Sequence, residues 1–542
     1  MPGTIWNFGD IFDTVGAHHG PGQPALIHGE RVIDWPQMTQ RSNNLARALR
    51  ACGAAAGDKV GFYMRNQPEY MEGFAACAKA RLTHVNVNYR YLDDELVYIF
   101  DNSDSVAAFY DAEFRGHVER VRARLPGVKT WIEVGGDGDT PDFALAYESL
   151  AGEGDGAPLD LERSGDDLMF LYTGGTTGMP KGVMWPHKVW REANTEALVQ
   201  IYGAAPANME EHLAFVDEIG QHGRQLPACP LMHGTGLFTA LGALLNGGAV
   251  VTLEGKAKFD PVELWEAVER HGVTAMAIVG DAFAKPMLKV LEEAPGRYDL
   301  SSVQSITSSG VMWSMEVKRG LIRHMPQVAL NDSFGASEAV GFGMSTTTAE
   351  GVFETAKFTI GSNCKVFSED GREIQPGSDE PGFIARGGAV PLGYYKDEEK
   401  TARTFRTING ERYAVPGDWC TVARDGTLTL LGRGSICINS GGEKIYPEEV
   451  EEALKEHPGV RDALVVGLPD ERWGQAVTAV VEPAVANAPD EATLIAFVRG
   501  RLAHYKAPKR VLFRESLGRA PNGKADYKAI REFALSELGQ HA

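Results

Sequence analysis

The sequence predicts an α/β fold in which a large part with mostly parallel sheets is followed by small antiparallel β structure and then by a separate α+β domain. Three observations support this prediction. Up to about residue 350, short apolar runs rich in β-branched or aromatic residues alternate with longer amphipathic stretches. Between about residues 360 and 432, short alternating runs are separated by Asp-Gly and Pro-Gly turns. After Arg433, helical and strand patterns alternate again.

The first part contains clear strand–loop–helix units. "DLMFLYT" (167–173) is typical of a strand and leads into a glycine-rich loop. "VTLEG" (251–255) predicts another strand, and the helix "DPVELWEAVERHG" follows it. Asp260 suits the N-cap of this helix, Pro261 suits its first turn, and Gly272 ends it. "AMAIVG" predicts the next strand, so we expect parallel pairing.

The last part of the chain has its own pattern. "YPEEVEEALKEHPG" predicts a helix with a proline near its start and acidic residues in its first turn. "RDALVVGLPD" predicts a strand. "DEATLIAFVRGRLAHY" predicts a second helix, with Leu494, Phe497, Val498 and Leu502 on one face.

The composition limits the classes of function. With 542 residues the chain is long enough for about three or four structural units. Its formal net charge of −20 argues against nonspecific binding of nucleic acid or of an anionic membrane surface. There is no signal-peptide pattern and no run of 18 apolar residues, so we expect no membrane span. The six scattered cysteines form no Cys-x-x-Cys pair, which predicts no zinc site, reduced thiols and a cytoplasmic location.

The stretch "LYTGGTTGMPKGV" (171–183) holds four glycines, and we expect neither a packed helix nor a strand there because glycine and Pro180 disfavour both. A strand that runs into a glycine loop with threonine hydroxyls and a lysine suits phosphate binding. The spacing differs from a P-loop, because Lys181 follows Pro180 and precedes Gly182, and it differs from Gly-x-Gly-x-x-Gly. A surface linker is the alternative interpretation.

This stretch resembles the phosphate-binding signature Tyr-Thr-Ser-Gly-Thr-Thr-Gly-x-Pro-Lys-Gly of the adenylate-forming superfamily, which comprises acyl-CoA synthetases, adenylation domains of peptide synthetases and luciferases. Gly174 stands where serine is usual, so one hydroxyl donor is lost. Four further motifs follow in the order of the family: "FGASE" (334–338), "VPGDW" (415–419), "LGRG" (431–434) and "RAPNGKADYK" (519–528). Alone, each motif is an ordinary turn or surface segment. Their joint order, from about residue 20 to about residue 530, is specific.

The resemblance implies a domain organisation. Residues 1–432 would form the N-terminal adenylate-forming domain, with two α/β subdomains and a small β-barrel-like subdomain. Residues 433–435 would be the hinge, and residues 436–542 a smaller, mobile α+β C-terminal domain that takes one pose for each half-reaction. The hinge position holds Ser435, where the family usually has Asp or Lys.

The resemblance also implies the nucleotide-binding residues. Phe334 would lie against adenine, Asp332 would accept a hydrogen bond from the adenine amino group, and Asp418 would accept from both ribose hydroxyls. Glu338 is a hard oxygen ligand suited to Mg²⁺ beside phosphates. The full set of predicted ATP-binding residues is Thr173, Gly174, Gly175, Thr176, Thr177, Gly178, Lys181, Ser309, Asp332, Phe334, Gly335, Ser337, Asp418, Arg433 and Lys524.

The implied chemistry has two steps. First, a carboxylate displaces pyrophosphate from ATP and forms an acyl-adenylate. Cationic groups offset the charge on the α-phosphate, so the resemblance assigns catalysis to Lys524, Glu338, Thr177 and Lys181. In the second step the thiol of coenzyme A displaces AMP. Gly441, Gly442 and Glu443 would face the pantetheine arm, and Lys506 in "YKAPKR" would contact CoA phosphates, although a solvated basic patch is an equal alternative there.

The segment "LPACPLMHGTGLFTALGALLNGG" (226–248) corresponds to the acyl pocket of the family. It holds no aspartate that would pair with a substrate ammonium, so we expect an acid without an α-amine. His233, Phe238, Val311 and Met312, with Trp313, are the predicted pocket residues. Two stretches, "YTGGTTGMPKGVMW" and "GRGSICINSGGEKIYPEEVE", resemble a subgroup that activates bulky carboxylates, including steroid side-chain acids, as does the insertion at 208–225.

Several alternatives stay open at this level. The substrate could be a medium- or long-chain fatty acid, and the acceptor could be a carrier protein rather than CoA. A luciferase-like monooxygenase uses the same adenylate, and a non-catalytic nucleotide-binding protein would need neither Glu338 nor Lys524. The implied partners are the acid, ATP and CoA, with Mg²⁺ as the metal and no nucleic acid, and the resemblance leaves homodimerisation open.

Overall fold

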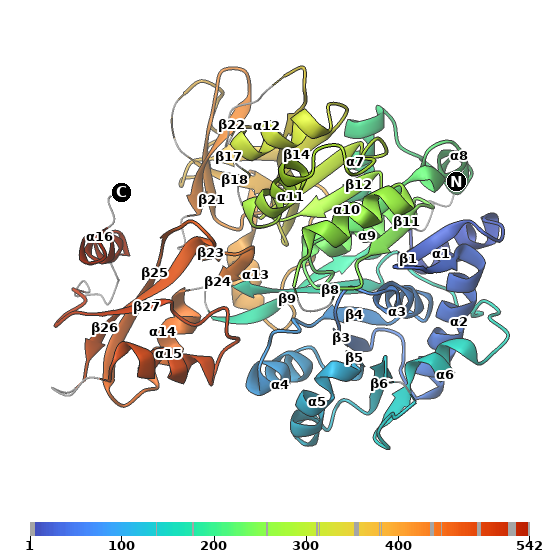
Figure 1. The fold of residues 1–542 in the computed structure, drawn as a ribbon, viewed down its shortest axis with the longest axis horizontal. Coiled ribbons are helices and arrows are strands. Elements are labelled where there is room, and N and C mark those ends of the chain that lie inside the picture. Colours follow the sequence, from blue (N-terminus) through green and yellow to red (C-terminus); the bar gives the residue numbers. More distant parts are fainter. Residues whose placement is uncertain are drawn as a thin grey trace. The chain divides into compact units, whose positions relative to one another are not determined.

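The computed structural model describes residues 6–136, 138–175, 178–255, 258–310, 313, 315–351, 357–378, 380, 382–433, 438–445, 447–484, 489–518 and 527–539. The chain divides into two compact units (Figure 1). The large unit comprises Met1–Tyr89, Ile99–Tyr172 and Gly182–Gly432. The small unit comprises Arg90–Tyr98, Thr173–Lys181 and Arg433–Ala542.

A parallel sheet is built from the first part of the chain, with the strand order β7-β6-β5-β3-β4-β8-β9. Its pairings from β7 to β8 are all parallel, as the alternating pattern predicts. The strands are β3 (Lys59–Tyr63), β4 (Thr83–Asn86), β5 (Ser105–Asp111), β6 (Thr130–Val134), β7 (Ala144–Ala146), β8 (Leu168–Gly175) and β9 (Gly178–Pro186).

A second, larger sheet has the order β19-β20-β18-β21-β22-β16-β15-β14-β13-β12-β10-β11-β1-β2, with β17 paired to β18. Strands β11, β10, β12, β13 and β14 pair in parallel in this order. The pairs β14–β15, β15–β16, β16–β22 and β18–β21 are antiparallel. The parallel half and its edge are β1 (Pro24–His28), β2 (Arg31–Asp34), β10 (Arg224–Pro227), β11 (Ala249–Thr252), β12 (Ala275–Ile278), β13 (Ser305–Ser309) and β14 (Ala329–Ala336).

The predicted antiparallel region between about residues 360 and 432 is confirmed as the other half of this sheet. Its strands are short because Gly and Pro turns interrupt the chain every few residues. The antiparallel half begins earlier than predicted, with β15 (Ala339–Thr347) and β16 (Lys357–Ile360). Within the predicted region the strands are β17 (Cys364–Phe367), β18 (Gly382–Arg386), β19 (Phe405–Ile408), β20 (Glu411–Ala414), β21 (Asp418–Val422) and β22 (Thr427–Arg433).

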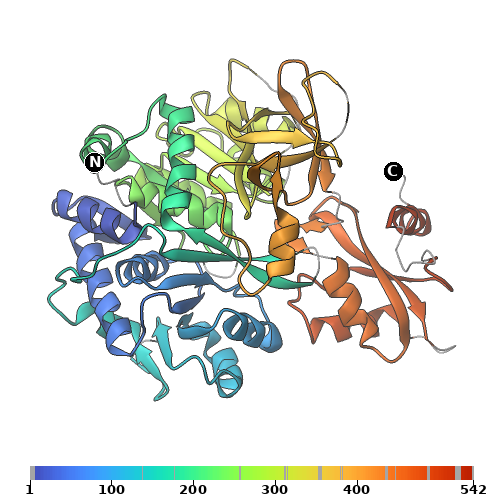
Figure 2. The same ribbon diagram turned by 180° about the vertical axis from the view of Figure 1, so that it is seen from behind.

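Helices pack along the sheets in groups that Figures 1 and 2 show from opposite sides. The helices of the first group contact one another and contribute many residues to the core; they are α1 (Phe8–His18), α2 (Trp35–Ala51), α3 (Pro68–Lys79) and α6 (Tyr147–Gly152). The second packs on the strands around β12: α9 (Gly234–Leu245), α10 (Pro261–His271), α11 (Asp281–Glu293) and α12 (Met315–His324). The other helices of this unit are α5 (Arg115–Val121), α7 (His187–Tyr202), α8 (Met209–Glu218) and α13 (Glu398–Thr404).

Helix α10 shows how local sequence sets its bounds. The Asp260 side chain accepts hydrogen bonds from the backbone N–H groups of Val262 and Glu263, and Pro261 is the first helical residue. Gly272 ends the helix with a φ of +58°, a conformation that glycine adopts at little cost. The predicted boundaries of this helix are confirmed.

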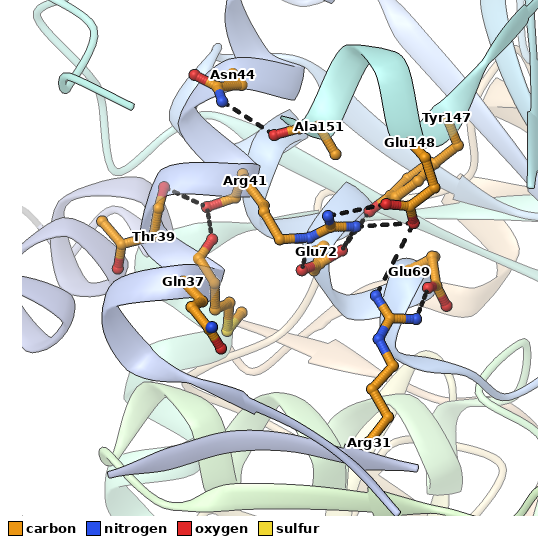
Figure 3. A network of polar contacts seen from close by, with 12 residues as sticks. Arg31, Gln37, Thr39, Arg41, Asn44, Glu69, Glu72, Tyr147, Glu148 and Ala151 are labelled. Atoms are coloured by element: carbon orange, nitrogen blue, oxygen red, sulfur yellow. Dashed lines mark hydrogen bonds and ion pairs between the residues drawn. The ribbon is translucent and has the colours of Figure 1, made fainter. Parts of the chain in front are cut away.

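A polar network joins α2, α3 and α6 (Figure 3). The Arg41 guanidinium donates to both oxygens of the fully buried Glu72, at 2.7 and 3.1 Å, and to Glu148 at 3.0 Å. The Tyr147 hydroxyl donates to Glu72 at 2.6 Å. Because a buried carboxylate is costly unless it is paired, the three hydrogen bonds that Arg41 and Tyr147 donate to Glu72 hold the helices in one arrangement.

The glycine-rich stretch differs from the prediction. It forms part of two strands, β8 and β9, so the prediction that it cannot be a strand is wrong. The physical reason is the position of Pro180, since β9 is the last strand of its sheet. An edge strand tolerates proline because one row of its N–H groups has no ladder partner to lose.

The small unit contains a sheet of order β24-β23-β26-β25, with β27 paired to β26. Its elements are β23 (Ile438–Ser440), β24 (Glu443–Ile445), α14 (Pro447–Lys455), β25 (Val460–Asp470), β26 (Gly474–Pro483), α15 (Glu491–Arg499), β27 (Arg510–Phe513) and α16 (Tyr527–Glu537), with α4 (Asp93–Asn102) reaching into the unit. The predicted strand and helices are present. However, α15 ends at Arg499 and not at Tyr505, because Gly500 follows and glycine is a poor helix former.

Candidate functional site

The turn between β14 and β15 carries the "FGASE" motif. The strands pair antiparallel, with Phe334 opposite Gly343 and Ala336 opposite Ala339, so Ser337 and Glu338 form the turn. Glu338 is 9% exposed, and its Oε1 accepts a hydrogen bond of 2.6 Å from the Tyr394 hydroxyl. Among the described residues, the Tyr394 hydroxyl is the one hydrogen-bond partner of this carboxylate, and it binds Oε1. A carboxylate oriented by one hydrogen bond suits a hard cation such as Mg²⁺, which takes one or two ligands from the protein and the others from phosphates and water.

Trp185, in β9, connects this turn with the predicted acyl pocket. Its side chain is fully buried, and its Nε1–H donates to the backbone oxygen of Ser337 at 2.9 Å. The same ring lies edge-on to Phe238 of α9, with a centroid distance of 6.2 Å. The structure therefore brings a predicted nucleotide motif and a predicted acyl-pocket residue together around one tryptophan.

The predicted adenine contact Asp332 is held by a lysine. Asp332 lies in β14 opposite Ser308 of β13, which places Ser309 beside it at the ends of parallel strands. The buried Lys318 Nζ, on α12, donates to Asp332 Oδ2 and lies 5.7 Å from the centre of the Trp313 ring. Burial raises the pKa of Asp332, and Asp281 adds to the effect, while Lys318 opposes it.

Two further predicted nucleotide residues lie in the same sheet. The ring of Phe334 is 8% exposed and packs on Phe342 and Phe358, with centroid distances of 5.2 and 5.4 Å. Asp418 is the first residue of β21 and is 6% exposed. The described contacts do not test whether these side chains meet adenine or ribose, so both roles stay predictions.

The predicted acyl residues on α9 occupy its first turns. His233 is the N-cap residue, and Phe238 is half-buried between Trp185 and Trp190, with a centroid distance of 5.7 Å to Trp190. Trp313 is 1% exposed. Because α9 itself carries no charged residue, the wall that it offers is apolar.

In the small unit, the glycine-rich strands place Thr173 at the end of β8 and Lys181 in β9. The Tyr98 hydroxyl, on α4, donates to the backbone oxygen of Pro180 at 3.0 Å. This bond fixes the backbone one residue before Lys181. Gly174, Gly175 and Gly178 are also strand residues.

The predicted CoA-facing turn is a two-residue hairpin. Ser440 pairs with Glu443, and Gly441 and Gly442 between them have φ values of +61° and +85°. Positive φ at both central residues is the pattern of a type I′ turn, which glycine adopts readily. A methyl group on Gly441 would lie 2.7 Å from the Trp473 ring, so the backbone also needs glycine for space.

Lys506 is not in a solvated basic patch. It is 4% exposed, its Nζ donates to Glu95 Oε1 at 2.8 Å, and it lies 4.9 Å from the centre of the Tyr91 ring. Glu443 forms an ion pair with Arg90 in the same unit. Contact of Lys506 with CoA phosphates stays a prediction, and it would require Lys506 to exchange this carboxylate for a phosphate.

Some predicted residues lie outside the described part of the chain: Thr176, Thr177, Val311, Met312, Ser435 and Lys524. For Arg433 the structure describes the backbone, at the end of β22. The roles assigned to these residues therefore stay predictions.

Three residues at this site have no signal in the sequence. Tyr394 lies 56 positions from Glu338, and Lys318 lies on an amphipathic helix where a lysine ordinarily faces solvent. Trp185 follows the glycine-rich motif, but an apolar residue there predicts core packing alone. Their contacts exist only because distant segments fold together.

Comparison with known proteins agrees with these motifs. Residues 12–395 match the model of the AMP-binding enzyme family, and residues 449–524 match that of the AMP-binding enzyme C-terminal domain. A medium/long-chain-fatty-acid–CoA and 3-oxocholest-4-en-26-oate–CoA ligase of Mycobacterium marinum is 41% identical over 529 residues, which cover 94% of each chain. A 3-oxocholest-4-en-26-oate–CoA ligase of Rhodococcus rhodochrous is 40% identical over 94% of this chain and 93% of its own.

Among solved structures, the amide bond synthetase McbA from Marinactinospora thermotolerans has a TM-score of 0.78 at 24% identity, covering 96% of this chain and 99% of that chain. This similarity confirms the predicted fold class. No helix in the described residues combines the length and the apolar character that a membrane crossing requires. Taken with the sequence relatives, these matches show that the chain belongs to the AMP-binding enzyme family of the adenylate-forming superfamily, and within it to the AMP-forming acid–thiol ligases.

Proposed function

We propose that this acyl-CoA synthetase activates a bulky hydrophobic acid, with a steroid side-chain acid such as 3-oxocholest-4-en-26-oate as its characteristic substrate. The single observation that carries the proposal is about 40% identity, over nearly the whole chain, to ligases named for that acid. Several of those relatives are also named for medium- and long-chain fatty acids. A fatty-acid substrate is therefore the second candidate.

The pocket chemistry supports an apolar acid without an amine. Helix α9 carries no carboxylate, and Phe238 is enclosed by Trp185 and Trp190. An ammonium group buried beside this wall would lack a counter-ion, which is costly. The aromatic side chains instead favour large, flat apolar surfaces.

The residues of the turn support the adenylation step. In that step a carboxylate oxygen of the acid forms a bond to the α-phosphorus of ATP, and the bond to pyrophosphate breaks. Mg²⁺ bound at Glu338 would neutralise charge on the phosphates. Tyr394 fixes the orientation of the Glu338 carboxylate through its hydrogen bond, and Lys318 fixes that of Asp332, which would accept a hydrogen bond from the adenine amino group. Lys181 and Lys524 would offset the negative charge that gathers around the α-phosphate.

The Gly441–Gly442 turn supports transfer to a thiol. Backbone without side chains lets a slender arm approach closely, as the pantetheine of CoA must. The CoA sulfur would then form a bond to the acyl carbon as the bond to AMP breaks. Homodimerisation, and the cytoplasmic location that the scattered cysteines favour, stay proposals of the sequence.

The test is a product assay. The protein is incubated with ATP, Mg²⁺, CoA and matched panels of steroid, aromatic and straight-chain acids, and the products are identified by mass spectrometry. We expect acyl-CoA and AMP, with the highest kcat/KM for a steroid acid. Thioester from straight-chain acids alone would favour the second candidate. Adenylate without thioester, at saturating CoA, would contradict CoA as the acceptor.

A further inference from the structure

Helices α7 and α9 face each other along a seam that begins at the predicted acyl pocket. Trp190 of α7 meets Phe238 of α9, and a methyl group on Gly242 would lie 3.5 Å from Asn194 Nδ2. Phe238 and Gly242 are four residues apart on α9, as Trp190 and Asn194 are on α7. These pairs therefore follow one face of each helix, away from the aromatic end.

Behind Asn194 lies an arginine that meets no carboxylate in the part of the chain that the structure describes. Arg191 is 0% exposed. Its guanidinium donates to Asn194 Oδ1 at 2.8 Å, to Asn246 Oδ1 at 3.2 Å and to His212 Nδ1 at 3.1 Å, and it lies 5.0 Å from the Trp6 ring. Burial lowers the pKa of Arg191 to about 10. Among the described residues this cation is thus surrounded by neutral acceptors alone.

The arginine fixes the orientation of the Asn194 amide. A guanidinium can only donate hydrogen bonds, so the atom of Asn194 that faces it must be the oxygen. The amide nitrogen, Nδ2, then points the other way, along the seam toward Gly242. Nδ2 has no acceptor among the described residues, although Asn194 is half-buried. A donor in that position is satisfied by water or by a ligand oxygen.

The seam lies in line with the predicted path of the acid. At one end, Trp185 joins Phe238 to Ser337 of the nucleotide motif, where the carboxylate of the acid must react. Gly242 is nine residues beyond His233, which is roughly 14 Å along the helix axis. The residues Phe238, Gly242 and Asn246 are all half-buried, so this face of α9 is not sealed by protein. A short acid would not reach Asn194, whereas an acid with an extended ring system would.

We propose that Asn194 is a specificity residue whose Nδ2 donates a hydrogen bond to an oxygen at the far end of a bulky acid, opposite its carboxylate. Arg191 is its positioning residue, because it binds the amide oxygen and so holds the Nδ2 donor on the side away from the guanidinium. The substrate class is a rigid apolar acid with a distal carbonyl, and the inference rests on the proposed function. A 3-oxo steroid acid has this chemistry, since its ketone and its carboxylate lie at opposite ends of the molecule.

The experiment compares two acids that differ in that oxygen alone: 3-oxocholest-4-en-26-oate and the same acid without the 3-oxo group. The readout is the ratio of their kcat/KM values for acyl-CoA formation. In the wild-type protein we expect the ratio to exceed about ten, mostly through KM, since a buried donor without its acceptor is unfavourable. Asn194→Asp keeps the oxygen that faces Arg191 and replaces the donor by an acceptor. It should lower the ratio by about tenfold or more without lowering the melting temperature.

Two further variants complete the design. Arg191→Gln releases the amide, so it should lower the ratio even if it also lowers stability, because a purely structural effect acts on both acids equally. Glu192→Gln, on the exposed side of the same helix, should leave the ratio unchanged. A wild-type ratio near one, or equal losses for both acids in Asn194→Asp, would overturn the inference while leaving the proposed function intact. If the wild-type protein forms no steroid thioester but does form fatty-acyl-CoA, the steroid assignment and the inference both fail.

Discussion

Two carboxylates of the candidate site each depend on one neighbouring side chain. Glu338 is oriented by the Tyr394 hydroxyl, and Asp332 is oriented by Lys318. In both pairs the partner comes from a different element: a loop before α13 in one case and α12 in the other. These partners touch carboxylates that we assign to the nucleotide, so their removal should affect ATP-dependent steps first.

Replacing Tyr394 by Phe removes one hydroxyl and leaves the ring. We expect the kcat/KM of adenylate formation to fall by about tenfold, and the Mg²⁺ concentration for half-maximal rate to rise, because a hydrogen bond to a charged group is lost. Pyrophosphate exchange at varied Mg²⁺ measures both quantities. Tyr395→Phe is the matched control, since its hydroxyl bonds to the exposed Asp104 at 2.7 Å. Equal effects of the two substitutions would contradict the role of Tyr394.

Replacing Lys318 by Met leaves Asp332 without its cation. The free energy of unfolding should fall by about 3 kcal/mol, the lower end for a broken buried pair, because Asp332 keeps some exposure. The KM for ATP should rise in the same variant. Urea unfolding and steady-state kinetics test both expectations. Arg319→Met, on the exposed side of α12, should change stability by no more than about 0.5 kcal/mol.

At the scale of elements, the ends of short strands place the chemistry. The β14–β15 turn presents Glu338, the end of β8 and the start of β9 carry the glycine-rich motif, and the β23–β24 turn presents Gly441 and Gly442. A hairpin turn fixes its backbone more tightly than a long loop does, because ladder hydrogen bonds hold both sides. Substitutions in these turns should therefore affect one half-reaction at a time.

Replacing Gly441 by Ala tests the β23–β24 turn. Its φ of +61° costs a non-glycine residue about 1–2 kcal/mol, and the added methyl would press on Trp473. We expect adenylate formation to persist and thioester formation to fall by about tenfold or more, because the turn is displaced. Single-turnover assays separate the two steps. Gly474→Ala is the control, since it also has a positive φ but its methyl would lie 3.8 Å from the nearest atom.

At the scale of the whole molecule, buried neutral histidines connect distant segments of the large unit. Burial lowers the pKa of His84 and of His187 to about 3, and that of His212 to about 4. His212 accepts from Arg191, and His187 accepts from the Phe8 backbone N–H, so each must stay neutral to keep its contact. Such groups make the folded state sensitive to acid.

The sign of the pH dependence follows from these shifts. The pKa values of the folded state lie below the ordinary 6.5, so between pH 6.5 and about 4 the unfolded chain binds more protons than the folded one. The free energy of unfolding should therefore be highest above pH 6.5 and should fall as the pH is lowered, by up to about 4 kcal/mol per pH unit for three groups. Urea unfolding at pH 7.5, 6.5 and 5.5 measures the slope. Between pH 6.5 and 5.5, His84→Gln should reduce this fall by about 1 kcal/mol, because the unfolded histidine is already half protonated at pH 6.5, and an unchanged fall would contradict the assignment.

Much of this protein is determined by short stretches of sequence. Asp260, Pro261 and Gly272 predict the bounds of α10, because capping depends on residues within one turn. The Gly441–Gly442 pair predicts a tight turn for the same local reason. The ordered motifs around Gly175, Glu338 and Asp418 indicate the superfamily, and the matching relatives confirm it.

The tertiary structure alone decided which side chains meet. The sequence does not show that Tyr394 reaches Glu338, that Lys318 reaches Asp332, or that Arg191 turns the Asn194 amide outward, because these contacts depend on the packing of elements. It also misleads at Pro180, whose effect depends on β9 being an edge strand, a property of the sheet and not of the residue. Local patterns fix caps and turns through interactions a few residues long, whereas the orientation of a catalytic or specificity group is set by neighbours that only the folded chain supplies.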